Sequence, residues 1–326
     1  MTGSRILVTG GAGYVGSHLT EALLEQGHAV RVVDNLSTGR RAFLSPCEGR
    51  EGFEFVEGDL LQGPVEDYLD GCDGVFHLAA SQDVRRALED TRMDVDQNIR
   101  VTHRLLEGMR RADTPRLGFA STSTIYGEVR TLPTPEDYGP LAPISLYGAS
   151  KLSGEALISA YSHTFGLDAV VYRFANVVGG RATHGVVYDL VAKLRRDREA
   201  LEILGRRPGT RKSYVYVGDC VAGVLAGWEA GKGGFEVYNV GSEDQISVEE
   251  VADVVCRAMG LKGVRYRWTG GVDAGRGWRG DVRDMWLDIA KLKDVGWRPK
   301  FSSEEAVRRA VQDLTTPGES APGDAI

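Results

Sequence analysis

The feature that most constrains this chain is a glycine-rich turn close to its N-terminus. The run Thr9-Gly10-Gly11-Ala12-Gly13-Tyr14-Val15-Gly16 joins an apolar stretch, Arg5–Thr9, to a segment with helical spacing, Tyr14–Gln26. Glycine lets a backbone turn sharply and approach a bound group closely, and 42 of the 326 residues are glycine. A strand, a glycine turn and an amphipathic helix in this order predict the first unit of an α/β fold.

Short apolar runs and helical patterns go on alternating up to about residue 175, which favours βαβ units. We therefore predict a Rossmann-type doubly wound parallel sheet, followed by a smaller C-terminal α/β domain. The predicted strands cover residues 29–34, 53–56, 75–78, 117–120 and 169–174, with helices over 98–111 and 147–165. Beyond residue 175 we predict strands near 213–217 and 236–240, helices over 186–196, 220–229 and 248–259, and a glycine-rich stretch over 269–280.

Composition excludes several classes of protein. Lys and Arg total 39 and Asp and Glu total 46, so the net charge is −7, and the chain as a whole does not attract nucleic acid or an anionic membrane. The four cysteines form no CxxC pair, and the six histidines show no metal-ligand spacing. No stretch is apolar for long enough to act as a signal peptide or a membrane span. We expect a cytoplasmic protein with no metal, nucleic-acid or membrane partner.

The glycine turn has the chemistry of a diphosphate site. Backbone N–H groups in such a turn reach phosphate oxygens, and the N-terminus of the following helix adds about half a positive charge. Asp34 ends the next strand, where a carboxylate accepts hydrogen bonds from both ribose hydroxyls of an adenosine and repels a 2′-phosphate. This pattern favours NAD over NADP as the cofactor. Arg40 and Arg41 leave NADP open, because a nearby arginine accommodates the extra phosphate.

Glycines 10, 13 and 16 are three residues apart twice over, unlike the two-then-three spacing of the common dehydrogenase fingerprint. This variant resembles the short-chain dehydrogenase/reductase superfamily, in its extended branch that modifies nucleotide sugars. Asp59-Leu60, His77-Leu78-Ala79-Ala80 and Asn98 also match positions of that branch. The resemblance covers about residues 5–312 and implies that NAD is bound by Gly10, Gly13, Tyr14, Val15, Gly16, Asp34, Asn35, Ser37, Gly39, Asp59, Leu60, Leu78, Ala79, Ala80, Asn98, Ser121, Tyr147, Lys151 and Phe174.

Tyr147 and Lys151 are the candidate catalytic pair. They open a predicted helix four residues apart, so both side chains share one face. At the switch point of a doubly wound sheet the strand ends line one crevice, which brings Ala79, Thr122 and Asn176 together beside the nicotinamide. A phenol with a pKa near 10 needs about 4 kcal/mol of phenolate stabilisation to act as a base at neutral pH. An ammonium and an oxidised nicotinamide together supply it.

We therefore assign Tyr147 as the base that takes a proton from a sugar hydroxyl while hydride leaves the same carbon for NAD. Lys151 lowers the pKa of Tyr147 and holds the ribose, and Thr122 hydrogen-bonds the reacting oxygen. In the resembled branch, 4,6-dehydratases carry an Asp-Glu pair at the next two positions, but Ser123 and Thr124 do no acid–base work near pH 7. The chain thus resembles the 4-epimerases of UDP-glucose and UDP-glucuronate, in which a 4-keto sugar rotates and takes the hydride back on its other face.

The second half of the chain is expected to hold the nucleotide sugar. Asn176, in Arg173-Phe174-Ala175-Asn176, resembles an asparagine that contacts the sugar diphosphate. Lys212 and Trp278 stand where the branch has phosphate-binding arginines, although other arginines lie beside them in the sequence. The implied substrate contacts are Arg85, Thr122, Ser123, Asn176, Arg181, Val187, Arg211, Lys212, Arg276 and Arg279.

The sequence leaves the substrate and two other functions open. Arg85, Arg86 and Arg181 can receive a C6 carboxylate, as a uronate requires, or a diphosphate or a surface aspartate. We favour UDP-glucose/UDP-galactose or UDP-glucuronate/UDP-galacturonate as the substrate, and a UDP-N-acetylhexosamine stays open. A dehydratase with a different acid and base is one alternative, and a non-catalytic NAD-binding protein is the other. The resembled branch commonly dimerises through two helices, so we expect a homodimer.

The same reasoning divides the chain into domains. Residues 1–175 plus about 213–242 are expected to form the NAD-binding domain. About 176–212 plus 243–314 are expected to bind the nucleotide sugar. Residues 315–326 contain Pro, Gly, Ser and Asp with little to bury, which predicts a disordered tail.

Overall fold

The computed structural model describes residues 3–81 and 89–316, and the chain divides into two compact units. Unit 1 comprises Met1–Ile125, Leu146–Arg173 and Val224–Tyr238, and unit 2 comprises Tyr126–Ser145, Phe174–Gly223 and Asn239–Ile326. The segment Tyr126–Ser145, which the sequence analysis assigned to the first domain, therefore groups with unit 2. The assignment of NAD and of the nucleotide sugar to different domains stays a prediction.

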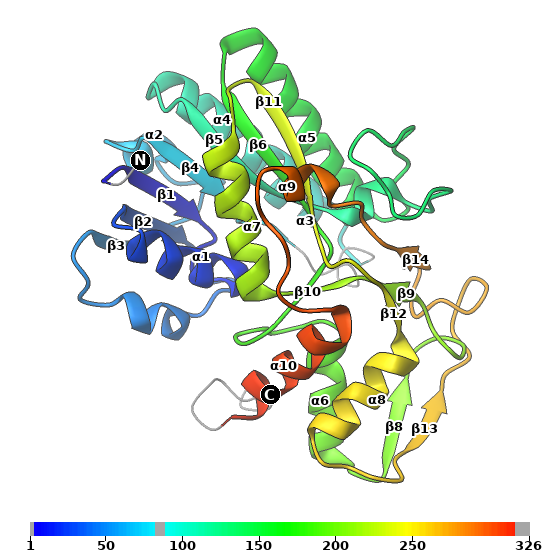
Figure 1. Ribbon diagram of the computed structural model, residues 1–326. Coiled ribbons are helices and arrows are strands. Elements are labelled where there is room, and N and C mark those ends of the chain that lie inside the picture. The colour runs from blue at the N-terminus through cyan, green and yellow to red at the C-terminus, as the bar shows by residue number, and fades with distance from the viewer. Residues whose placement is uncertain (1–2, 82–88, 317–326) are drawn as a thin grey trace. The chain divides into compact units, whose positions relative to one another are not determined.

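The main sheet has seven strands in the order β11-β6-β5-β4-β1-β2-β3 (Figure 1). These strands are β1 (Arg5–Thr9), β2 (Ala29–Asp34), β3 (Phe53–Glu57), β4 (Gly74–His77), β5 (Arg116–Thr122), β6 (Asp168–Phe174) and β11 (Phe235–Val240). β1 pairs in parallel with β2 and with β4, β2 with β3, and β4 with β5. The strand order reverses at β1, so the topological switch point lies between β1 and β4. The predicted Rossmann-type doubly wound sheet is confirmed.

Helices cover both faces of this sheet. They are α1 (Tyr14–Glu25), α2 (Val65–Leu69), α3 (Arg92–Asp94), α4 (Val101–Arg111), α5 (Leu146–Phe165) and α7 (Val217–Ala230), with shorter turns η1 (Arg41–Cys47), η3 (Val95–Arg100) and η4 (Ser123–Tyr126). Successive strand residues point to opposite faces. Val75 of β4 packs in one buried cluster with Leu105 of α4 and Ile158 of α5. Phe76, the next residue, contacts Trp228 of α7 at a ring distance of 4.5 Å, so α7 covers the other face.

Unit 2 combines short sheets with helices that pack on one another, α6 (Val186–Arg196), α8 (Val248–Ala258) and α10 (Ser303–Thr315). β7 (Asn176–Val178) pairs with β10 (Tyr214–Tyr216), β8 (Ala200–Ile203) pairs with β13 (Arg265–Trp268), and β9 (Arg211–Lys212) lies between β12 (Ile246–Ser247) and β14 (Asp284–Met285). A short helix, α9 (Ala290–Asp294), precedes α10. The elements predicted beyond residue 175 are all present, within a few residues of their expected bounds.

The sequence analysis missed β8, β13 and α10. The start of α10 has a recognisable signal, because Ser302 and Glu305 form a capping box in which each side chain accepts from the other's backbone N–H. Thr315, which the sequence analysis placed in the disordered tail, is instead the last residue of this helix. The rest of that predicted tail, from residue 317 on, lies outside the described residues.

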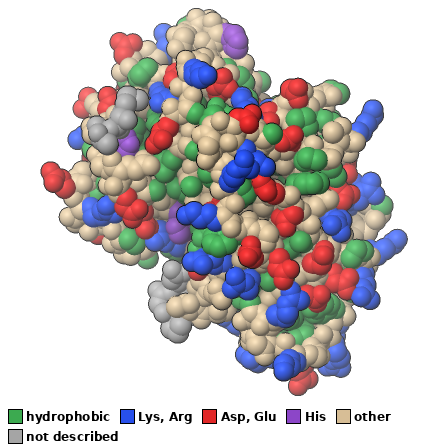
Figure 2. Space-filling model, viewed as in Figure 1, with side chains coloured by type: hydrophobic (Ala, Val, Ile, Leu, Met, Phe, Trp, Pro, Cys, Tyr) green, Lys and Arg blue, Asp and Glu red, His purple; other side chains and the backbone are tan. Residues whose placement is uncertain are grey.

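Charges of both signs are interspersed on the surface. On the face that Figure 2 shows, Lys and Arg side chains alternate with Asp and Glu. Within residues 3–81 and 89–316, no helix combines the length and the apolar character that crossing a membrane requires. In the same ranges, no three His, Cys, Asp or Glu side chains gather as metal ligands do.

Candidate active site

The glycine turn after β1 is packed so tightly that its glycines have no room for a side chain. Gly10 has a φ of +69°, and a Cβ at this position would lie 2.6 Å from the backbone nitrogen of Ala79, which follows β4. A Cβ on Gly16 would fall on the carbonyl oxygen of Gly10. These close approaches bring the turn onto the carboxyl ends of β1 and β4, which is the switch point of the sheet.

The N-terminus of α1 is chemically different from those of α8 and α10. Ser247 and Ser302 cap α8 and α10, each with a glutamate three residues on. At α1 the N-cap is Gly13, and within the described ranges no side chain caps it and no acidic residue lies in the first turn. The positive end of its dipole therefore meets no carboxylate of its own first turn, as suits an anion site. This end of α1 fits the diphosphate of NAD.

Asp34 at the end of β2 is held in place by the same turn. Its carboxylate is buried and accepts hydrogen bonds from the backbone N–H of Ala12 at 3.0 Å and of Leu36 at 2.8 Å. Burial raises the pKa of Asp34, and these two hydrogen bonds oppose the rise. A Cβ on Gly39 would lie 2.8 Å from this carboxylate. The tight fit keeps Asp34 at the place where the sequence analysis expected it to meet a ribose.

Arg40 and Arg41, the two arginines that could accommodate the 2′-phosphate of NADP, contact other groups. Arg41 forms an ion pair with Glu48 at 2.8 Å and stacks over the ring of Phe55. Arg40 lies over the ring of Phe43 at 5.7 Å. Both interactions hold these guanidinium groups against η1 and β3. The structure thus agrees with the preference for NAD that Asp34 indicates.

Several other predicted cofactor residues lie around Asp34. Asn35 donates to the carboxylate of Asp59 at 3.4 Å and accepts from the backbone N–H of Ser37 at 3.1 Å. Asp59 also accepts from the N–H of Leu61 at 2.7 Å, and the side chain of Leu60 is buried. These contacts order the loops after β2 and β3, which lie side by side because those strands are neighbours.

Tyr147 and Lys151 occupy the first turns of α5, as the sequence predicts. Lys151 is only 3% exposed, and its ammonium donates to the carbonyl oxygen of Ala120 in β5 at 2.8 Å. Burial lowers the pKa of Lys151 to about 8, although the carboxylates of Glu155 and Asp94 oppose this. Burial and the charge of Asp94 raise the pKa of Tyr147. The phenol therefore keeps its proton at neutral pH unless further positive charge comes close.

Thr122 and its neighbours lie where β5 ends. The side chains of Ser121, Thr122 and Ser123 are all buried. The hydroxyl of Thr122 lies 3.2 Å from that of Thr124 and accepts from the Thr124 backbone N–H. The hydroxyl of Ser121, a predicted cofactor contact, donates to the carboxylate of Glu155.

A chain of buried hydrogen bonds links the end of β1 to α4. The ring of His77 lies between the hydroxyls of Thr9, at 2.7 Å, and Thr102, at 3.2 Å. Thr102 donates its proton to the carbonyl oxygen of Asn98 at 2.5 Å, so it accepts from Nε2–H of His77, and Nδ1 accepts from Thr9. Burial and the charge of Lys151 lower the pKa of His77 to about 3. The imidazole is therefore neutral.

Asn98 continues this chain toward the catalytic helix. Its amide donates to the hydroxyl of Ser150 at 2.8 Å and to the carbonyl oxygen of Ser81 at 3.0 Å, and its oxygen accepts from the Ser81 N–H. Ser150 in turn donates to the backbone oxygen of Tyr147 at 2.8 Å. That Asn98 contacts the cofactor stays a prediction, and its amide orders Ser81 and Ser150 around it.

The buried neutral imidazole makes stability depend on pH. The unfolded chain binds a proton at His77 near pH 6.5 and the folded protein only near pH 3, so the free energy of unfolding falls as the pH drops below about 6.5. Between pH 7 and pH 5 the expected loss from this residue is about 2 kcal/mol. Urea unfolding at both pH values should show a smaller difference for His77→Gln than for wild type. Equal differences would contradict the burial argument.

The predicted substrate residues of unit 2 divide into a more buried and an exposed group, and the exposed Arg279 also forms an ion pair, at 3.9 Å with Asp273. Lys212 forms an ion pair with buried Asp281 at 2.5 Å and lies over the ring of Trp278. Arg276 pairs with Glu128 at 2.5 Å. Arg211 and Arg279 are exposed.

The other predicted contacts of the substrate and of the nicotinamide are more varied. Asn176 donates to the carbonyl oxygen of Ser213 at 3.3 Å, and Val187 is buried in α6. Arg181 has a φ of +63°. Phe174 is half-buried at the end of β6. Arg85 and Arg86 lie outside the described residues.

Comparison with known proteins identifies the family. A model of the NAD dependent epimerase/dehydratase family matches residues 6–241. The chain belongs to this family. The UDP-glucose 4-epimerase of Mycolicibacterium smegmatis is 33% identical to it over 317 residues, which cover 94% of this chain and 97% of the relative.

Solved structures of this family have the same fold. A crystal structure of a UDP-galactose 4-epimerase is 40% identical, with a TM-score of 0.83 over 95% of this chain and 98% of that one. A UDP-glucuronic acid 4-epimerase from Bacillus cereus, in complex with UDP-glucuronic acid and NAD, is 28% identical, with a TM-score of 0.86 over 95% and 98%. The resemblance to extended short-chain dehydrogenases/reductases is confirmed, and the chain is an enzyme of the epimerase/dehydratase family whose cofactor is NAD.

Sequence reasoning missed the carboxylates of the site. Glu155 of α5 and Arg173 of β6 form a buried ion pair at 2.7 Å, and the hydroxyl of Ser121 donates to the same carboxylate. Asp94 in α3 is buried as well. Lys151 and Glu155 are four residues apart, which is a readable signal for one helical face. Their burial is not readable, because such pairs are usually exposed to solvent.

Proposed function

We propose that this protein is a UDP-sugar 4-epimerase that inverts C4 of a UDP-hexose. The observation that carries the proposal is the placement of Tyr147 and Lys151 on one face of α5, with the Lys151 ammonium bonded to β5 two residues before Thr122. NAD, when bound, would supply reversible hydride transfer at C4 and the positive charge of its oxidised ring. The glycine turn, the N-terminus of α1 and Asp34 are the groups that would hold it.

Three side chains of unit 1 carry the proton chemistry in this proposal. Tyr147 accepts the proton of the C4 hydroxyl as the 4-keto sugar forms, and gives it back when the sugar is reduced. Lys151 stays protonated and favours the phenolate by its charge. Thr122 hydrogen-bonds the C4 oxygen throughout. Since the same proton and hydride return to the sugar, the reaction consumes neither.

Unit 2 would bind the nucleotide part of the substrate. Lys212 and Arg276 are cations next to carboxylates, and Arg211 and Arg279 are exposed. We propose that some of these groups contact the UDP diphosphate and that Asn176 contacts the same group. The sugar is UDP-glucose/UDP-galactose or UDP-glucuronate/UDP-galacturonate.

The competing reaction is loss of water from the sugar. It needs an acid and a base beside Thr122, and the next two residues are Ser123 and Thr124, whose hydroxyls serve neither role near pH 7. The hydroxyl of Thr124 moreover lies within hydrogen-bond distance of Thr122. These contacts favour epimerisation.

The test is a panel of UDP-glucose, UDP-galactose, UDP-glucuronate, UDP-galacturonate and UDP-N-acetylglucosamine, each incubated with the purified protein without added NAD. Chromatography of the sugars should show one pair of C4 epimers interconverting. A 4-keto-6-deoxy product, which absorbs in alkali, would assign a dehydratase instead. No conversion of any sugar would contradict the proposal and favour a non-catalytic NAD-binding protein.

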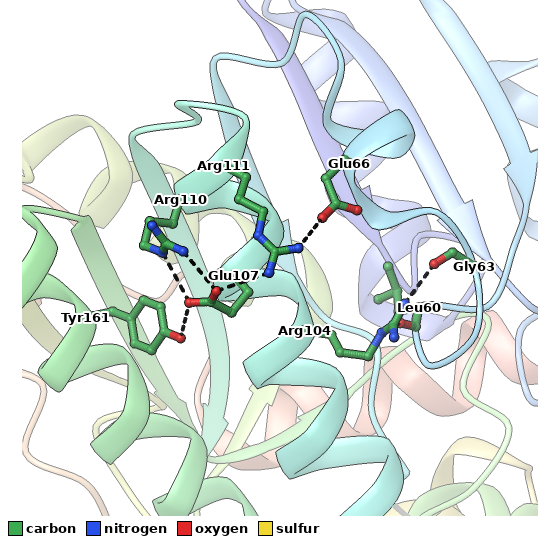
Figure 3. Close-up of polar contacts among 8 residues, drawn as sticks. All are labelled: Leu60, Gly63, Glu66, Arg104, Glu107, Arg110, Arg111 and Tyr161. Atoms are coloured by element: carbon green, nitrogen blue, oxygen red, sulfur yellow. Dashed lines mark hydrogen bonds and ion pairs between the residues drawn. The ribbon is translucent and has the colours of Figure 1, made fainter.

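We also propose that the protein is a homodimer that uses the outer surface of α4 and α5. Figure 3 shows that Glu107 accepts from Arg110 and Tyr161, while Arg111 reaches Glu66. Because these charges already have partners, a second subunit that covers them leaves no unpaired charge buried, although covering the pairs still costs desolvation. Phe165 at the end of α5 is 56% exposed and adds apolar area. Light scattering tests the proposal, since a dimer has twice the chain mass of 35.4 kDa.

A further inference from the structure

The catalytic helix is attached to the end of β5 by two neighbouring side chains. Lys151 and Glu155 are four residues apart and lie on one face of α5. The ammonium of Lys151 donates to the carbonyl oxygen of Ala120, and the hydroxyl of Ser121 donates to Glu155. Ala120 and Ser121 directly precede Thr122, so these contacts fix the helix of Tyr147 against the strand of Thr122.

Glu155 is also the centre of a buried ion pair. Its side chain is 3% exposed and that of its partner, Arg173 of β6, is 5% exposed. One guanidinium nitrogen lies 2.7 Å from Oε2, and Nε of Arg173 lies 3.2 Å from both carboxylate oxygens. Burying such a pair costs desolvation that often cancels its attraction. Stability alone is therefore a weak reason for a carboxylate at this position.

The surroundings of Lys151 show what this carboxylate does. The ammonium interacts with the charges of Glu155 on α5 and Asp94 of α3 and with His77 of β4, and Tyr147 lies one helical turn away on α5. His77 is neutral, and Arg173 is paired with Glu155. Burial lowers the pKa of Lys151 to about 8, and Glu155 is the larger of the two charges that oppose this. Without Glu155, burial would act on Lys151 with only Asp94 to oppose it.

We propose that Glu155 is a positioning residue that keeps Lys151 protonated and holds the catalytic helix against the end of β5. The proposal rests on the proposed function for its effect on rate, but the state of Lys151 does not depend on any substrate. Loss of the Glu155 charge removes the larger of the two negative charges that act on Lys151 and leaves the buried Arg173 unpaired. The ammonium then gives up its proton at lower pH, and the phenol of Tyr147 loses its partner in the range where the enzyme works.

The test measures the titration of the Lys151 ammonium by NMR in the NAD-bound protein. Lysine labelled with 13C at Cε gives one signal for each of the eight lysines, and Lys151→Arg identifies the signal of Lys151. In Glu155→Gln this signal should titrate about one pH unit or more below its wild-type value, and the alkaline limb of kcat should move to lower pH with KM unchanged. Glu54→Gln is the matched control, because it also removes a carboxylate that pairs with an arginine, Arg31 at 2.8 Å, but one outside the site, and its Lys151 signal should titrate as in wild type.

Glu155→Gln leaves the buried Arg173 unpaired, which destabilises the fold. A second variant therefore tests the proposal without an unpaired buried charge. Glu155→Met with Arg173→Met replaces the whole pair by apolar side chains, and the Lys151 signal should again titrate below its wild-type value because burial remains and the carboxylate is gone. A Lys151 signal that titrates as in wild type in both variants would overturn the proposal. If wild type converts no UDP-sugar, the proposed function fails, and the Lys151 titration still decides the role of Glu155.

Discussion

Tyr147→Phe is expected to lose nearly all turnover, with kcat about 10²- to 10⁴-fold below wild type, the range that one general acid–base group contributes. Phenylalanine keeps the ring in the first turn of α5 and removes only the hydroxyl. The backbone oxygen of residue 147 still accepts from Ser150, so the helix start is preserved. Initial rates on the converted UDP-sugar, together with the NAD content of the purified variant, measure the effect.

Tyr161→Phe is the matched control for this substitution. Tyr161 lies on the same helix, and its hydroxyl donates to Glu107 at 2.7 Å on the surface that α5 shares with α4. Its loss should leave kcat within a factor of two or three. A Tyr147→Phe enzyme that kept a tenth of wild-type turnover would remove Tyr147 from the proposed role.

Gly16→Ala is expected to lose NAD. In the interior of a helix alanine is favoured over glycine by about 1 kcal/mol, so propensity alone predicts a more stable protein. The added Cβ would, however, fall on the carbonyl oxygen of Gly10, and overpacking against backbone typically costs 1–3 kcal/mol. Because about 1.4 kcal/mol is tenfold in affinity, NAD should bind about ten- to a hundredfold more weakly as the turn shifts.

Calorimetric titration of NAD into cofactor-free protein measures this loss, and thermal unfolding shows whether the fold is also affected. Gly139→Ala is the control, since a Cβ at Gly139 meets nothing within 4 Å and should change neither quantity. Wild-type NAD affinity in Gly16→Ala would show that the turn tolerates a side chain and that its close packing is not needed for binding.

The local part of this site was readable from the sequence, because each element follows from residues close together. The glycine turn, the strand that ends at Asp34 and the pair Tyr147 and Lys151 all follow from spacing within one strand or one helix. The π-helical turn η3 was not predicted, since Val95–Arg100 has an ordinary helical pattern. The missed α10 was readable in principle from the capping box of Ser302 and Glu305.

The long-range part of the site depends on partners that spacing does not reveal. Lys212 meets Asp281 and Arg276 meets Glu128, and in both pairs the partners are far apart in the sequence. Glu155 reads as the exposed partner of a helical i,i+4 pair, but α5 buries this face against β5 and β6. Because the tertiary structure buries this face of α5, Glu155 is part of the site and not a surface carboxylate.

The hydrogen bonds from Thr9 through His77 and Thr102 to Asn98 all run in one direction. Each ring nitrogen has a single role, each hydroxyl accepts one hydrogen bond and donates another, and the chain goes on through Ser150 to end at the peptide carbonyl of Tyr147. To relay a proton, such a chain would have to charge a fully enclosed imidazole, which its low pKa opposes. It therefore fixes the position of these groups and does not carry protons, and in the proposed mechanism the proton of Tyr147 passes only between the phenol and the substrate.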